Sequence, residues 1–325
     1  MPRARITDWE RHIGRRLRLR DLFVLFTVVD AGSMAKAAAQ LGVSTPSVSA
    51  LLADLEHALG VRLLDRTPKG VRPTLYGQTI LRRGRAAFDE LRQGIRDIEF
   101  LADPAAGEVR IACPESLAAY LALVIERIVA KHPAFRFNVQ VVSRMSSSEF
   151  QELLERKADL RLARLTKPPV RGRLGENYEA EVLFDDPFFI VVGRKSRWAH
   201  ARTVDLAELA REPWIFTPDD ALAGLLVAAA FRDKGLEPPK AAIETFSIHL
   251  RSMLASTGKY VAVLPRSFLR TSGERYELKA LPVHLSHRPS PVAAVTLRNR
   301  TLTPAVDVFL QYTREVAKSL GDHAR

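Results

Sequence analysis

The chain has 325 residues, of which 47% are hydrophobic, so it is long enough for two or three domains and too apolar for a disordered chain. Its 49 lysines and arginines exceed its 37 aspartates and glutamates and give a formal net charge of +12, which favours a polyanionic partner. The single cysteine excludes a disulfide framework and a multi-cysteine metal site, and no apolar run reaches the roughly 20 residues that span a bilayer.

Residues 1–18 are rich in arginine and form a basic arm that either lies on DNA phosphates or is a frayed, solvated terminus. The apolar run at 22–29 has basic residues before it and small residues after it, a pattern that resembles a secretory signal. However, Asp21 and Asp30 bracket this run, and its large side chains fall on one face of a helix. We therefore expect a first helix that packs on the elements after it, and a cytoplasmic location, which the single cysteine also favours.

Two short helices joined by a tight turn are predicted next. Ser33 suits the N-cap of the first and Gly42 its C-terminal end, while Pro46 suits the first turn of the second, capped by Ser44 or Thr45. This spacing is typical of a helix-turn-helix, whose second helix presents its N-terminal side chains to the major groove of DNA. The alternative is an ordinary helical hairpin. The candidate DNA-binding residues here are Ser33, Ser44, Thr45, Pro46, Ser47 and Ser49.

Two short extended pieces flank the turn-forming sequence Pro68-Lys69-Gly70 and predict a β-hairpin, or wing. Arg66, Lys69 and Arg72 on this hairpin can reach phosphates or the minor groove, and the alternative is a solvated basic turn. We place the DNA-binding domain, a winged helix-turn-helix, at residues 19–74.

A long linker helix is predicted at 75–103, with Thr74 as its cap. Its apolar and small residues follow a heptad spacing, which suits a coiled coil between two copies of the chain. A dimer would bring two recognition helices to two half-sites. We interpret Gly84 and Gly94 as places of close helix approach, and the alternative is that they are only weak spots of the helix. The seam consists of Ile80, Gly84, Ala87, Leu91, Gly94, Ile98 and Leu101.

The Asp-Pro-Ala-Ala-Gly sequence at 103–107 ends this helix, and strand-like and helix-like segments alternate after it. This order predicts a doubly wound, parallel α/β sheet, and the pattern restarts after Pro168-Pro169. We therefore expect a two-lobed α/β effector domain at 107–325, with lobe I at 107–167 and 266–325 and lobe II at 168–265. The expected strands are at 109–113, 137–142, 160–163, 188–192, 214–216, 241–245, 260–264 and 281–297, and the helices are at 116–131, 148–156, 221–234, 247–256 and 304–318.

Ligands of open α/β sheets bind beyond the carboxyl ends of the strands. Serines and threonines at helix N-termini suit an anionic ligand there, and nearby arginines add charge. The alternative is that these residues are only helix caps and surface charges. The candidate effector-binding residues are Ser116, Arg144, Ser146, Ser147, Arg164, Thr217, Thr245 and Ser247.

The assembled features resemble a LysR-type transcriptional regulator over nearly the whole chain from about Leu17. The most specific match is Gly32-Ser33 with Ala37-Ala38, followed by Leu41-Gly42-Val43-Ser44 and Pro46-Ser47-Val48-Ser49. Weaker matches, such as Glu212-Pro213-Trp214 and Val261-Ala262-Val263-Leu264-Pro265, look most like the branch that responds to sugars, sugar acids and aromatic acids.

The resemblance implies a winged helix-turn-helix, a dimerising linker helix and an effector domain like periplasmic binding proteins. It also implies a homotetramer that bends promoter DNA under the control of a small effector, with RNA polymerase as a further partner. This chain has Thr45 where the family usually has Gln, and a Thr can contact a thymine methyl but cannot pair bidentately with adenine. It also has Leu64 where Phe is common, and Arg161 in a strand expected to be buried.

No arrangement typical of an enzyme is found. Cys113 has no histidine at an informative spacing, and no G-x-S-x-G, H-E-x-x-H or phosphate-binding glycine loop occurs. We therefore predict a non-enzymatic, nucleoid-associated regulator without a metal, catalytic residues or a cofactor other than a small, anionic effector. The alternatives are an exported solute-binding protein, a metabolic enzyme with an added DNA-binding domain, and a structural nucleoid protein.

Overall fold

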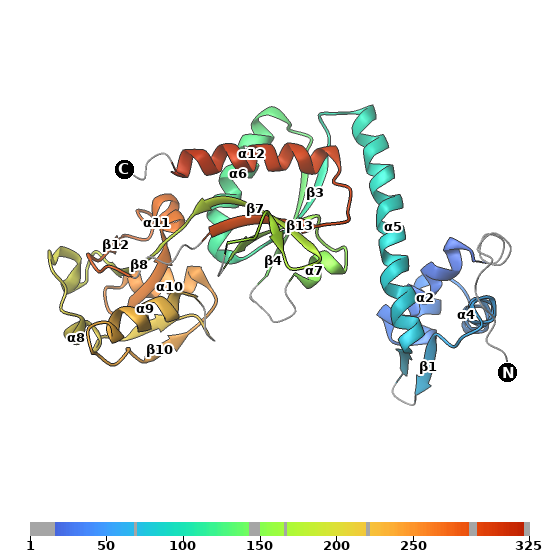
Figure 1. Cartoon of the computed structure of the whole chain (residues 1–325), viewed down its shortest axis with the longest axis horizontal. Coiled ribbons are helices and arrows are strands. Elements are labelled where there is room, and N and C mark those ends of the chain that lie inside the picture. Colours follow the sequence, from blue (N-terminus) through green and yellow to red (C-terminus); the bar gives the residue numbers. More distant parts are fainter. Residues whose placement is uncertain are drawn as a thin grey trace. The chain divides into compact units, whose positions relative to one another are not determined.

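The computed structural model describes residues 17–67, 70–142, 150–165, 168–218, 222–285 and 291–321. It divides the chain into two compact units, residues 1–92 and 93–325, which are treated separately below (Figure 1). The predicted basic arm lies almost wholly outside the described residues. Four predicted site residues also lie outside them: Lys69, Arg144, Ser146 and Ser147.

The first unit contains the predicted helix-turn-helix and hairpin. Its elements are α2 (Leu19–Ala31), α3 (Met34–Leu41), α4 (Thr45–Leu59), β1 (Leu64–Thr67) and β2 (Gly70–Pro73). Leu25 and Val28 of α2 are fully buried, as are Ala37 of α3 and both Val48 and Leu55 of α4. Each helix therefore contributes one apolar face to a common core, as its periodicity predicts.

Helix α5 (Leu75–Ala102) is the predicted linker helix. Thr74 caps it, because its Oγ1 accepts a hydrogen bond from the Gly77 amide at 3.0 Å. A Cβ at Gly84 would lie 2.8 Å from Cζ of Phe26, so this glycine admits a ring of α2. Gly84 is thus a place of close helix approach, as predicted, and the helix that it admits is α2 of the same chain. A Cβ at Gly94 would meet no described atom within 4 Å.

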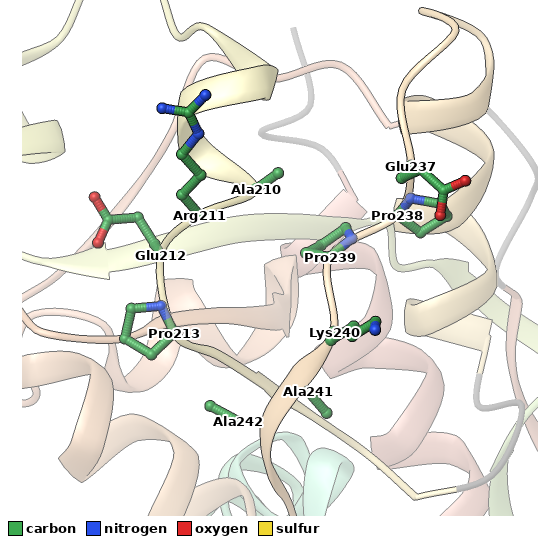
Figure 2. Close-up of a pocket in the computed structure, with 10 residues that line it drawn as sticks. All are labelled: Ala210, Arg211, Glu212, Pro213, Glu237, Pro238, Pro239, Lys240, Ala241 and Ala242. Carbon is green, nitrogen blue, oxygen red and sulfur yellow. The ribbon is translucent and has the colours of Figure 1, made fainter.

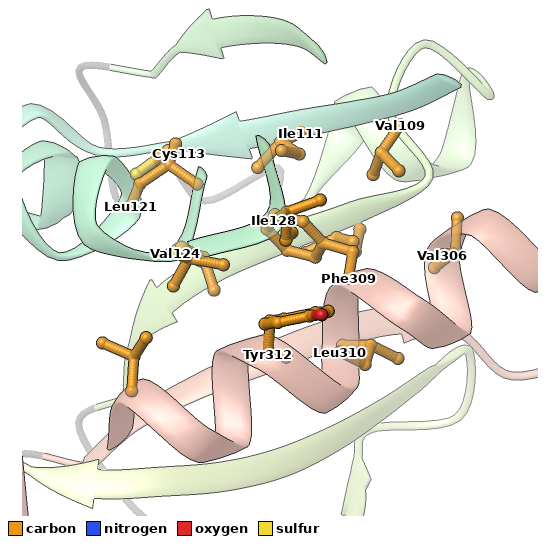
Figure 3. Packing of buried hydrophobic residues seen from close by; sticks show 14 of the residues in the cluster. Val109, Ile111, Cys113, Leu121, Val124, Ile128, Val306, Phe309, Leu310 and Tyr312 are labelled. Atoms are coloured by element: carbon orange, nitrogen blue, oxygen red, sulfur yellow. The ribbon is translucent and has the colours of Figure 1, made fainter. Parts of the chain in front are cut away.

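The second unit begins with a six-stranded sheet whose strand order is β4-β3-β5-β13-β7-β6. Helices α6 (Ala118–Lys131) and α12 (Pro304–Gly321) pack on it, and Figure 3 shows Phe309 among Ile111 and Val124 in the resulting core. The strands are β3 (Glu108–Cys113), β4 (Arg136–Val141), β5 (Leu160–Arg164), β6 (Arg173–Leu174), β7 (Tyr178–Asp185) and β13 (Pro291–Leu297).

A five-stranded sheet with the order β10-β9-β11-β8-β12 forms the second lobe. Its core centres on Trp214, which is fully buried and stacks on Phe216. The strands are β8 (Phe188–Gly193), β9 (Trp214–Phe216), β10 (Ala241–Glu244), β11 (Val261–Pro265) and β12 (Leu278–Ala280). The helical segments are η3 (Arg197–His200), α8 (Leu206–Leu209), α9 (Leu222–Arg232), α10 (Ile248–Ser256) and α11 (Arg266–Ser272).

Both sheets are mixed, whereas a parallel arrangement was expected. Strand β13 runs antiparallel to β5 and β7, and β8 runs antiparallel to β11 and β12. Because β7 and β8 belong to different sheets, as do β12 and β13, the chain passes from the first sheet to the second after Asp185 and is back in the first sheet at Pro291. The predicted boundaries at 168 and 266 were wrong in this respect, because pairing between distant strands, not the local pattern, decides which sheet a strand joins.

The helix predicted at 148–156 is also shorter in the described residues. Helix α7 spans Gln151–Leu154, and Phe150 before it has a φ of 60°, in the left-handed region. The segment expected as a helix from Ser116 begins instead with the 3₁₀ turn η2 (Glu115–Leu117), and α6 follows it.

A buried charge cluster surrounds Asp159, whose exposed fraction is 2%. Its Oδ1 accepts hydrogen bonds from Arg110 at 2.6 Å and from Arg300 at 2.7 Å, and its Oδ2 accepts the Arg110 amide at 2.8 Å. Arg96 of α5 lies 3.6 Å from Oδ2. Burial raises the pKa of Asp159, but the hydrogen bonds and charges of Arg110 and Arg300 outweigh it and hold the pKa below its usual value.

We predict that Asp159→Asn lowers the free energy of unfolding by about 3 kcal/mol or more at pH 7, because it leaves buried guanidinium groups without their carboxylate. Since the folded pKa is below the unfolded value of about 3.9, this contribution is complete above about pH 4 and is lost as the pH falls further. Urea denaturation across this pH range measures it. The exposed Asp233→Asn is the control, and an equally small effect of both changes would contradict the prediction.

The two glycines of α5 give a matched pair. Gly94→Ala should raise the free energy of unfolding by about 0.5–1 kcal/mol, because alanine favours a helix and no described atom of the chain lies within 4 Å of its Cβ. The free energy of unfolding of Gly84→Ala should be about 1–2 kcal/mol lower than that of Gly94→Ala, because the added Cβ displaces the Phe26 ring. Denaturation curves of the two variants decide this, and equal stabilisation would show that the ring yields freely.

Candidate DNA-binding surface and effector site

The N-terminus of α4 is built by its cap. Ser44 has extended backbone angles, and its Oγ accepts the Ser47 amide at 3.3 Å, while Ser33 accepts the Lys36 amide at 3.5 Å for α3. Gly42 has a φ of 65° at the end of α3. The predicted turn between the two helices is therefore confirmed, with Ser44 rather than Thr45 as the cap.

The first turn of α4 presents Thr45, Pro46 and Ser47 to solvent, whereas the opposite face of the helix is buried. The Ser47 hydroxyl lies 2.8 Å from that of Ser44, so it already belongs to the cap. Ser49 is half-buried. Within the described part of the chain, the Thr45 side chain has no hydrogen bond. Its hydroxyl and methyl group are therefore both available to a base edge.

Glu56 is a structural residue that the sequence pattern did not reveal. Its Oε1 accepts the amides of Leu63 at 2.7 Å and Leu64 at 3.1 Å and thereby joins α4 to the start of the wing. The sequence indicates this role of Glu56 only by placing an acidic residue on the border of the apolar face of α4. The wing itself approaches α2, because the Val71 amide donates to the Gly32 carbonyl at 3.1 Å.

The predicted wing residues are only partly described. Strands β1 and β2 pair antiparallel, with Asp65 opposite Arg72, and the Arg72 side chain is exposed. Arg66 lies on β1, but its side chain is outside what the structure describes. Arg72 is thus the predicted basic residue of the hairpin whose side chain the structure describes.

The two arginines of β5 have partners within the chain. Arg161 pairs with Glu152 at 2.8 Å and its guanidinium lies over the Phe150 ring, which explains how a buried strand accommodates it. Arg164, a predicted effector residue, pairs with the buried Asp186 at 2.5 Å. Its charge is therefore balanced by this chain, and it is not a freely available anion receptor.

Three other predicted effector residues that the structure describes lie at the N-terminus of α10 and in the turn η2. Ser247 caps α10 by accepting the Leu250 amide at 3.2 Å, and Thr245 Oγ1 accepts the Ser247 amide at 3.1 Å. Ser116 is half-buried in η2, on the other lobe. Its neighbour Glu115 was not predicted, although its carboxylate bonds directly to the start of α10.

Hydrogen-bond donors without acceptors gather in this part of the second unit. The Nε atoms of Arg164 and Arg251 and the Thr217 hydroxyl are buried and have no hydrogen-bond partner among the described residues. Arg251 is 4% exposed, and its Nη1 donates to the Val263 carbonyl at 2.9 Å. Burial lowers the pKa of Arg251 to about 10, the Glu115 charge raises it, and the Arg164 charge lowers it. The charges of Arg251 and Arg164 therefore act on each other, and an added acceptor between them would be favoured.

Two surface depressions lie elsewhere. Figure 2 shows one of about 540 Å³, where Arg211, Glu212 and Lys240 lie beside the edge strand β10. The other, of about 650 Å³, lies against β7 and α12 and is crossed by the exposed Arg314–Glu181 ion pair. Neither is lined by a described residue of the predicted effector set.

The described ranges give little support for a metal site, a membrane-spanning helix or a reactive cysteine. They contain no group of three potential metal ligands and no helix long and apolar enough to cross a membrane. Cys113 is buried, and this burial raises the pKa of its thiol to about 12, although Arg161 and Arg164 lower it. It is therefore a protonated core residue at neutral pH, not a reactive thiolate.

Comparison with known proteins matches both units. The HTH-type transcriptional regulator GbpR of Azospirillum brasilense is 26% identical over 306 residues, which cover 92% of this chain and 86% of GbpR. ArgP from Mycobacterium tuberculosis has the same fold, with a TM-score of 0.65 at 20% identity over 93% of this chain and 97% of ArgP. Full-length CbnR in complex with its target DNA has a TM-score of 0.64 at 20% identity, over 92% of this chain and all of CbnR.

Two family models match the chain directly. The bacterial regulatory helix-turn-helix domain of the lysR family matches residues 19–78, and the LysR substrate binding domain matches residues 102–318. These matches agree with the predicted regulator and not with a metabolic enzyme. The chain therefore belongs to the LysR family of transcriptional regulators.

Proposed function

We propose that this regulator binds promoter DNA sequence-specifically through the first turn of α4 and the wing. The observation that carries this proposal is the exposed first turn of α4, where Thr45 is held at the helix N-terminus beside the capping Ser44. A solved neighbour of the same fold, CbnR, is bound to its target DNA, which supports the same use of the domain here.

The active form that we propose is a dimer through α5, assembled into a homotetramer. Support comes from the apolar residues that α5 leaves exposed, since Leu91, Ile98 and Leu101 continue the heptad seam and are 50%, 67% and 78% exposed. Ile95 widens this surface and is 58% exposed. We also propose RNA polymerase as a partner and the cytoplasmic nucleoid as the location, because promoter DNA and the polymerase are found there.

The effector that we propose is a small carboxylate bound between the two lobes, with no other cofactor. Support comes from the buried Nε atoms of Arg251 and Arg164, which lack acceptors in the described chain and whose guanidinium groups interact electrostatically. The buried Thr217 hydroxyl also lacks a partner there. Buried donors that remain unsatisfied cost free energy, and a carboxylate supplies acceptors and a compensating charge.

We expect Thr45→Ala to weaken binding to the DNA upstream of this gene by up to about tenfold, because a bidentate base contact contributes about 1–3 kcal/mol of discrimination and the single contact of a threonine falls at the lower end of that range. Binding to random DNA should change less than twofold, since phosphate contacts position the protein without reading sequence. Fluorescence anisotropy with both DNAs measures this. His57→Ala, at the exposed end of the same helix, is the control. Equal losses on both DNAs would overturn the assigned recognition surface.

Calorimetry of the full-length protein tests the effector. A panel of small carboxylic acids, each paired with its uncharged amide, should contain an acid that binds one per chain while its amide does not. Footprinting then shows whether that acid changes the protection of a dyad-symmetric site. Binding of amides alone would refute an anionic effector, and uniform protection of all DNA would refute sequence-specific regulation.

A further inference from the structure

The N-terminus of α10 already holds an anion, and that anion belongs to the protein. The Glu115 carboxylate accepts hydrogen bonds from the Ile248 amide at 2.9 Å, the His249 amide at 3.3 Å and the Ser247 hydroxyl at 3.3 Å. The first amides of a helix have no partner inside it, and its dipole favours a negative charge there. Glu115 therefore occupies the place that a ligand carboxylate would take.

The contact joins the two lobes. Glu115 begins η2, directly after β3 of the six-stranded sheet, whereas α10 packs against β8 and β11 of the five-stranded sheet. The bonded residues are more than 130 positions apart in the sequence. One carboxylate thus links one lobe to a helix of the other.

A second observation points to a ligand beside this contact. Arg251, one turn further along α10, is 96% buried, yet its Nε has no acceptor in the described residues, and its guanidinium interacts electrostatically with Glu115. Glu115 itself satisfies the helix amides and not this Nε. A free carboxylate is not tethered to η2. It can therefore bond to the helix amides and also approach the Arg251 guanidinium, whose Nε Glu115 leaves unsatisfied.

We propose that Glu115 is a resident occupant of the carboxylate subsite at the N-terminus of α10, and that a carboxylate effector must displace it. This inference rests on the carboxylate effector of the proposed function. Displacement follows because each amide is already bonded and because two carboxylates side by side repel. Glu115 then sets the effector concentration that is needed for binding. The apparent affinity decreases as the fraction of molecules with an open subsite decreases. Displacement of Glu115 also removes a link between the lobes.

The test compares full-length wild type with Glu115→Ala and uses acetate, which has the carboxylate that the substitution removes. In Glu115→Ala, the amides of Ile248 and His249 should exchange with solvent faster, and acetate should slow them again. Acetate should bind this variant at least tenfold more tightly than the wild type. Glu126→Ala, an exposed glutamate of α6, is the matched control and should behave as the wild type. Glu115→Gln keeps the side-chain size, removes the charge and should also bind acetate more tightly.

Other outcomes would overturn the proposal. Equal acetate affinity and equal exchange in wild type, Glu115→Ala and Glu115→Gln would show that Glu115 does not hold the subsite. If a panel acid binds wild type and Glu115→Ala equally, the carboxylate effector stands and the resident role of Glu115 falls. If acetate restores exchange in Glu115→Ala but no panel acid binds either protein, Glu115 is only a structural link, and the carboxylate effector of the proposed function falls with the displacement.

Discussion

The buried carboxylate of Asp159 is the interaction on which the effector unit depends. It neutralises Arg110 of β3 and Arg300 before α12, and Arg96 at the end of α5 lies close to it. Segments that are distant in sequence therefore meet at one charge, and the buried guanidinium groups of Arg110 and Arg300 would be costly at this depth without it. The register of β3 and β5, whose carboxyl ends lead to the proposed subsite, follows from this arrangement.

The same unit balances most of its interior arginines within the chain. Arg161 pairs with Glu152, and Arg164 pairs with Asp186 at the crossing between the two sheets, where Asp186 also accepts the Ser267 amide and hydroxyl. Arg251 differs, because in the described chain it is hydrogen-bonded through one nitrogen to a carbonyl and pairs with no carboxylate within ion-pair distance. Arg251 therefore carries a positive charge without a paired carboxylate on the helix whose first amides bind Glu115 of the other lobe.

The DNA-binding domain could be predicted from the sequence because its helix ends and turns depend on interactions between neighbouring residues. The caps Ser33, Ser44 and Thr74 and the turn glycine Gly42 act on their own neighbours, so their positions could be predicted closely. The effector half depends on distant pairings, such as β7 with β13, which local periodicity cannot show. For the same reason Glu115 was missed although Ser116 and Ser247 were predicted, since its role arises only when η2 meets α10.

The protonated thiol of Cys113 has a practical consequence for the study of this regulator. The chain has one cysteine, and its burial and its pKa of about 12 keep it unreactive near neutral pH. A cysteine introduced at any exposed position would then be the sole thiol that accepts a spin label or fluorophore. Distances between labels on the two lobes, or on two copies of α5, are therefore accessible without first removing a native residue from the core.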